Sequence, residues 1–160
     1  MRRKAYRLID EPSPGAMARI AVEPIWPLLA LMLAGNWLGM PWLALNGFAV
    51  GSPTRWRESM LAALGLLGSF LLAFGLSYAW QARFIESEHV LRYALLSLVV
   101  WKLAFGYLIF SLQSATIELY QYYGGVLGRF GLPVALLGGF LLRGMVLGLF
   151  SSSIWFLVLS

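Results

Sequence analysis

The chain has 160 residues, of which 60% are hydrophobic and 12% are charged, with a formal net charge of +5. A soluble domain has about 25% charged residues, so this composition excludes an ordinary water-soluble globule and indicates a single domain in lipid. Cysteine is absent, which excludes a disulfide framework and a thiolate metal site.

The first 24 residues are a basic leader that precedes the first hydrophobic stretch. Five of the twelve basic residues lie in it, so the charge indicates membrane orientation, and no nucleic-acid partner is expected. Asp10, Glu11 and Glu23 and the lack of a small-residue cleavage site argue against a signal peptide. Two interpretations of the leader stay open. It only orients the first helix, or it also binds anionic lipid headgroups through Arg2, Arg3, Lys4 and Arg7.

Four apolar stretches are each long enough to cross a hydrocarbon core about 30 Å thick as a helix. They extend over approximately residues 25–50, 60–80, 93–115 and 132–155. Because backbone polar groups in lipid must bond within their own segment, each stretch is predicted to be helical. The sequence therefore predicts an all-α polytopic integral membrane protein, a single transmembrane domain over residues 1–160 built as a bundle of four transmembrane helices with short loops.

Four crossings place both termini on one side of the membrane. If that side is the cytoplasm, the leader and residues 81–92 place seven Lys and Arg residues there, and the other two connections place three outside. Cytoplasmic loops carry an excess of Lys and Arg. We therefore expect cytoplasmic N- and C-termini in a bacterial-type inner membrane.

Two basic residues interrupt the apolar stretches, Lys102 in the third and Arg143 in the fourth. Lys102 lies nine residues into its span, about 13–14 Å, and Arg143 eleven residues into its own, about 16–17 Å at helical rise. Because the two spans run in opposite directions, both cations are predicted at nearly the same depth, close to the midplane. All seven acidic residues, Glu58 included, are predicted outside the spans.

Such a charge costs roughly 2.5–3.5 kcal/mol at the bilayer centre on insertion scales, so it requires local stabilisation. Three explanations stay open. Each side chain snorkels to the headgroups, or polar groups of neighbouring helices solvate it, or it meets an acidic residue of a partner helix or an anion in a hydrated path. The polar groups expected near the cations are Asn36 and Gln113, with Ser69, Ser97 and the carbonyls near Pro41.

Glycines line the helix faces that carry Lys102 and Arg143 and recur at four-residue spacing elsewhere, which is typical of close helix packing in membranes. We expect them to pack helices within the bundle rather than between subunits; they are Gly35, Gly39, Gly106, Gly139, Gly144 and Gly148.

No set of residues typical of catalysis is present. His89 is the single histidine, in a charged connection, and it has no partner for metal or haem ligation. Ser151–Ser153 have no accompanying base, and no phosphate-binding or dinucleotide motif occurs. We therefore expect neither an enzyme nor a bound cofactor or metal.

The leading hypothesis is a non-catalytic integral membrane subunit that anchors or assembles with other transmembrane helices in a larger inner-membrane complex. Its partners are then the lipid bilayer and other membrane subunits or copies of itself. The alternative is a homo-oligomeric pore or carrier with an anion-selective path lined by Lys102 and Arg143.

Overall fold

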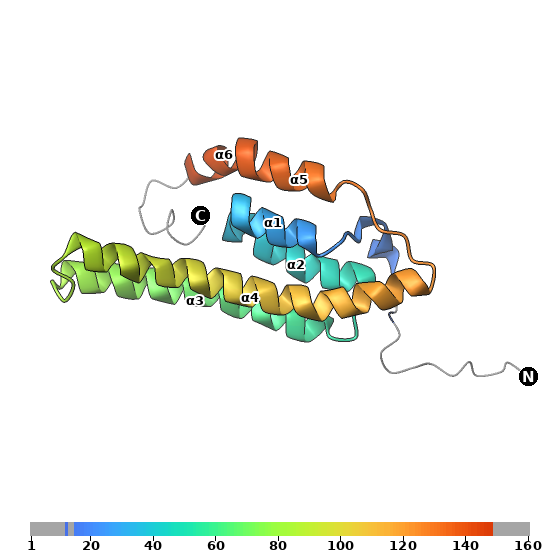
Figure 1. Cartoon of the computed structure of the whole chain (residues 1–160), viewed down its shortest axis with the longest axis horizontal. Coiled ribbons are helices and arrows are strands. Elements are labelled where there is room, and N and C mark those ends of the chain that lie inside the picture. Colours follow the sequence, from blue (N-terminus) through green and yellow to red (C-terminus); the bar gives the residue numbers. More distant parts are fainter. Residues whose placement is uncertain (1–11, 13–14, 149–160) are drawn as a thin grey trace, which may run out of the picture.

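The computed structural model of the chain describes residues 12 and 15–148, and the elements in this part are all helical. The prediction of an all-α fold is therefore confirmed for the described residues. In chain order (Figure 1) the elements are η1 (Ala16–Ile20), α1 (Ile25–Leu33), α2 (Asn36–Val50), α3 (Arg55–Gln81), α4 (Glu88–Tyr122), α5 (Gly131–Leu137), the π-helical turn η2 (Gly138–Leu142) and α6 (Arg143–Gly148).

Two long helices, α3 and α4, lie side by side along the full length of the molecule (Figure 1). At helical rise, α3 with 27 residues is about 40 Å long and α4 with 35 residues about 52 Å. Both are long and apolar enough to cross a membrane, judged by length and composition. They contain the spans predicted over residues 60–80 and 93–115, and each extends beyond its predicted span.

The span predicted over residues 25–50 is two helices that fold back on each other. Gly35 separates α1 from α2 with a φ of 102°, in the left-handed region that glycine adopts without strain. The backbone of Leu31 lies so close to Gly39 that a Cβ at position 39 would overlap it. Leu31 lies four positions before Gly35 and Gly39 lies four positions after it. Their contact therefore shows that α1 and α2 form an antiparallel hairpin. This corrects the prediction of one continuous membrane-crossing helix.

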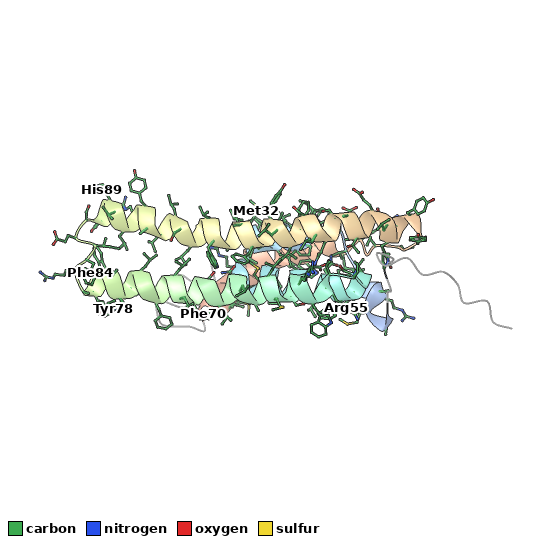
Figure 2. The ribbon with its side chains drawn as sticks, turned by 90° about the horizontal axis from the view of Figure 1, so that it is seen from below. Met32, Arg55, Phe70, Tyr78, Phe84 and His89 are labelled. Carbon is green, nitrogen blue, oxygen red and sulfur yellow. The ribbon has the colours of Figure 1, made fainter. Side chains whose placement is uncertain are left out.

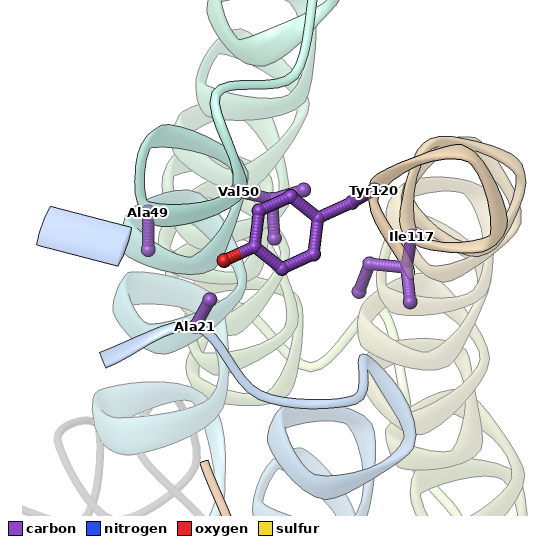
Figure 3. Close-up of a cluster of buried hydrophobic side chains, with 5 residues drawn as sticks. All are labelled: Ala21, Ala49, Val50, Ile117 and Tyr120. Carbon is purple, nitrogen blue, oxygen red and sulfur yellow. The ribbon is translucent and has the colours of Figure 1, made fainter. Parts of the chain in front are cut away.

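The open ends of the hairpin meet other connections at one end of the bundle, which we call the base. A buried apolar cluster there joins Ala21, before α1, to Val50 at the end of α2 and Tyr120 near the end of α4 (Figure 3). The backbone N–H of Gly128, in the α4–α5 connection, donates to the carbonyl of Ala21 at 2.7 Å. The α3–α4 connection lies at the opposite end of the molecule (Figure 1).

This arrangement differs from the predicted topology, which placed the leader on the same side as residues 81–92. The reason is that the chain reverses at Gly35, so the segment before α1 and the end of α2 lie together at the base. The prediction of a cytoplasmic C-terminus falls on residues 149–160, which lie outside the described residues.

The last described segment, α5 to α6, packs along the hairpin. Gly138 contacts the side chain of Leu38, and Gly139 contacts Leu33, so this segment approaches both α2 and α1 closely. Its start at Gly131 agrees with the span predicted to begin near residue 132. The predicted end near residue 155 lies outside the described residues.

The packing is densest in the half of the molecule that contains the hairpin. There, Leu31, Met40, Leu43 and Ile109 are fully buried in one cluster that joins α1, α2 and α4. Beyond the hairpin, α3 and α4 continue as a two-helix arm, and large side chains point outward from it (Figure 2), as at Tyr78 with 69% exposed.

Candidate functional site: two cations at the hairpin tip

The tip of the α1–α2 hairpin supplies the acceptor for a basic side chain. Arg143, at the start of α6, donates from its guanidinium to the carbonyl of Leu33 at 3.1 Å. Leu33 is the last residue of α1, and the final carbonyls of a helix have no partner within it and carry partial negative charge. Gly139, one turn earlier, contacts Leu33 and so brings the segment close enough for this bond.

Lys102 approaches the same tip from α4. Gly106, one turn along α4, contacts the side chains of Leu28 and Leu31 in α1. A step of one turn, about 5–6 Å, from Gly106 brings Lys102 to the level at which α1 ends. Lys102 and Arg143 are both half-buried and lie close enough for their charges to repel each other. The structure thus brings together the two cations that the sequence predicts at one depth.

Asn36 fixes the tip against α3. It is 2% exposed, and its side-chain N–H donates to Ser69 Oγ at 3.0 Å. Ser69 in turn donates to the carbonyl of Gly65, which also accepts the indole N–H of Trp101 at 3.2 Å. Because Trp101 precedes Lys102 in α4, this chain of bonds holds the lysine's helix, α3 and the hairpin tip in register.

Gln113 was predicted beside the cations and lies elsewhere. It shares a helix face with Lys102, but the two are eleven residues apart, about 16 Å along α4. Its amide N–H group donates to the carbonyl of Leu43 at 2.6 Å and to Glu58 Oε2 at 3.0 Å. Equal orientation around a helix does not mean equal depth, and this corrects the predicted grouping. Ser97 was also expected near the cations, and its hydroxyl donates instead to the carbonyl of Ala94 in its own helix.

Glu58 is the polar residue that sequence reasoning placed wrongly. It was predicted in an outer connection, but it lies in the first turn of α3 and is 0% exposed. Its carboxyl group accepts hydrogen bonds from the hydroxyls of Ser52 and Thr54 and from the amide of Gln113. The available signal was the isolated Asn46 and Gln113 within apolar stretches, which need polar partners when they are buried.

Asn46 extends this cluster to the segment before α1. Its amide both accepts from the N–H of Val22 at 2.9 Å and donates to the carbonyl of Val22 at 3.0 Å. It also donates to Gln113 Oε1 at 3.1 Å. We call the connected set the base network; it joins α2, α3, α4 and the segment before α1, and it comprises Val22, Asn46, Ser52, Thr54, Glu58 and Gln113.

The predicted packing glycines divide into two groups. Gly39, Gly106 and Gly139 contact neighbouring helices of the same chain, and Gly35 forms the turn of the hairpin. At Gly144 and Gly148, by contrast, no described atom lies within 4 Å of where a Cβ would be. The face of α6 next to Arg143 is therefore open in the described structure.

Some predicted residues lie outside the described part of the chain, namely Arg2, Arg3, Lys4, Arg7 and Ser151–Ser153. Within the described part, no group of three or more His, Cys, Asp or Glu side chains is arranged to hold a metal ion. No protein family, characterised protein or solved structure matches this chain significantly.

Proposed function

We propose that this protein is an integral membrane protein that binds a transmembrane helix of a partner subunit at its hairpin tip, without catalysing a reaction. The exposed surface of α3 and α4 supports a membrane location. Only 22% of the apolar window of α3 and 17% of that of α4 is buried, whereas a core helix of a soluble protein is mostly buried. Exposure of this much apolar surface is typical of contact with lipid or with other helices.

The hairpin in this proposal enters the bilayer and returns to the same side. At nine residues, α1 is only about 13 Å long, too short for a core about 30 Å thick. Irregular backbone at such a depth is tolerated where protein covers it, and Ala34 and Asn36 on either side of the turn are buried.

The distribution of basic residues supports a cytoplasmic base. Among the described residues, four arginines lie at or next to the base and two beside the α3–α4 connection, and four further basic residues precede them in the leader sequence. The base set is Arg19, Arg55, Arg57 and Arg129, and the other set is Arg83 and Arg92. Since cytoplasmic segments are enriched in Lys and Arg, we propose that the base faces the cytoplasm of a bacterial-type inner membrane.

Single-cysteine labelling tests this topology, since the natural chain has no cysteine. Ala16→Cys and Val126→Cys at the base and Phe84→Cys at the far end are all at exposed positions. A membrane-impermeant maleimide should label Ala16→Cys and Val126→Cys from the same side and Phe84→Cys from the other. Labelling of Ala16→Cys and Phe84→Cys from one side would instead support four crossings.

The observation that carries the partner-binding proposal is that Arg143 is half-buried at the hairpin tip, where it bonds to the carbonyl of Leu33, at the level that Lys102 reaches from α4. Like charges that repel each other at low dielectric are stabilised by an anionic group placed between them. Within the described residues Arg143 makes one hydrogen bond and no ion pair. The open glycines of α6 beside it would let a partner helix approach closely enough for its Asp or Glu to reach the cations.

Purification from native membranes in mild detergent tests partner binding. The Arg143→Leu variant should bind the partner with an affinity about tenfold lower or weaker still. A tenfold loss of affinity corresponds to roughly 1.4 kcal/mol. The matched control is Arg92→Leu, because Arg92 is 75% exposed at the far end of the arm and should leave the assembly unchanged. Survival of the same assembly in a folded Arg143→Leu variant would refute the proposal.

A second candidate function rests on the same two charges. Several copies of the chain could enclose a hydrated path in which Lys102 and Arg143 select anions. The bonding of Gln113 within the base network removes one residue expected to line such a path. Chloride flux into liposomes distinguishes the candidates, since a helix-binding subunit should give no flux above that of empty vesicles.

A further inference from the structure

An apolar groove runs between α2 and α5 on the side of the hairpin away from α3. Its volume is about 330 Å³, within the range of roughly 300–1,000 Å³ that is typical of small-molecule sites. Its walls are mainly aromatic and aliphatic, and they include Ile20, Trp37, Pro41, Leu45, Phe130 and Val134.

The groove is aligned with the long axis of the molecule. Trp37, Pro41 and Leu45 are spaced four residues apart, so they share one face of α2 and extend about 12 Å along it. Because α2 runs roughly along α3 and α4 (Figure 1), the groove leads from the base toward the hairpin tip. In the proposed membrane this is the direction of the lipid acyl chains.

Two arginines adjoin, in sequence, residues that line the basal end of the groove. Ile20 lines the groove, while the preceding residue, Arg19, lines a second hollow of about 380 Å³ against Tyr120 and Gly128. The exposed Arg129 directly precedes Phe130, which lines the groove. No carboxylate among the described residues lines either hollow. An apolar groove thus opens beside two arginines.

We propose that this groove binds one acyl chain of an anionic phospholipid, with the lipid phosphate at Arg19 and Arg129. This rests on the membrane location in the proposed function but not on the partner helix. Charge complementarity selects the anionic headgroup.

Native mass spectrometry of the full chain in detergent tests headgroup selection. The probes are phosphatidylglycerol and phosphatidylcholine with identical acyl chains. The wild type should prefer phosphatidylglycerol, and each of Arg19→Gln and Arg129→Gln should reduce that preference about fivefold. Equal binding of both lipids by the wild type, or an undiminished preference in the double variant, would overturn the proposal.

A substitution that blocks the groove tests acyl-chain binding separately. Leu45→Trp should reduce the binding of both lipids severalfold, while Leu64→Trp on α3 should not. The two leucines are matched in exposure, 48% for Leu45 and 52% for Leu64. Equal lipid binding by these variants would place the lipid elsewhere. Arg143→Leu should keep full lipid binding. Survival of the partner complex in this variant would therefore contradict the proposed function and leave this inference intact.

Discussion

The base network and the hairpin tip both hold polar groups inside an apolar bundle, but they satisfy them differently. In the base network a fully buried carboxyl group, Glu58, accepts from two hydroxyls and an amide of the same chain. At the tip, Arg143 bonds to one backbone carbonyl, and it repels the neighbouring Lys102.

The difference separates a structural role from a functional one. Buried polar groups with complete hydrogen bonding fix one packing of the helices, and removal of a member leaves its partners unsatisfied. Under the proposed function, the base should govern stability and the tip should govern assembly.

The largest expected effect on stability comes from Glu58→Ala. This change leaves the donors of Ser52, Thr54 and Gln113 without their acceptor, and we expect it to lower the free energy of unfolding by about 3 kcal/mol or more. Titration of the purified protein from mild detergent into sodium dodecyl sulfate, followed by circular dichroism, measures the change. Glu118→Ala, at an exposed position on α4, is the control and should have little effect.

An intermediate effect is expected from Gly47→Ala. The added Cβ would overlap Glu58 Oε2 in the base network, and overpacking of this kind costs about 1–3 kcal/mol. Gly144→Ala adds the same methyl group where the described structure is open, and helix propensity there favours alanine by up to about 1 kcal/mol. The two variants should therefore change the unfolding midpoint in opposite directions. A shift of equal size and sign would remove the distinction between base and tip.

The smallest effect on stability is expected from Arg143→Leu, although it should have the largest effect on partner binding. The loss of one hydrogen bond is offset by the loss of repulsion from Lys102, so the free energy of unfolding should change by less than about 1 kcal/mol. A double-mutant cycle with Lys102→Leu should show that either removal relieves the same repulsion. Additive effects of the two substitutions would mean that the two charges do not interact.

Hydropathy and helical rise predicted part of this structure correctly. The apolar runs within α3 and α4 are long and free of acidic residues, so their helices followed from composition, and counting residues at 1.5 Å each placed Lys102 and Arg143 at one level. Neither argument depends on contacts between distant residues.

The parts that were missed depend on such contacts. Residues 25–50 are mostly apolar and carry no charge, and hydropathy does not distinguish one long helix from two short ones joined at Gly35. Glu58 was predicted in a connection because nothing near it in the sequence indicates a buried partner. One of its hydrogen-bond donors, Gln113, is 55 positions away. The carbonyl that holds Arg143 comes from Leu33, 110 positions earlier, rather than from the region of Pro41.

The sequence separation within the base network has a consequence for biogenesis. Asn46 and Val22 leave the ribosome early and can pair at once, but Glu58 cannot complete its bonding until Gln113 has been synthesised. The first apolar stretch of the nascent chain must therefore reach its folded-back form, or be returned to it, before α4 closes over it. In the membrane of the proposed function, synthesis interrupted before residue 113 should leave that stretch free to insert as a crossing helix, and the helices after it would then have the inverse orientation.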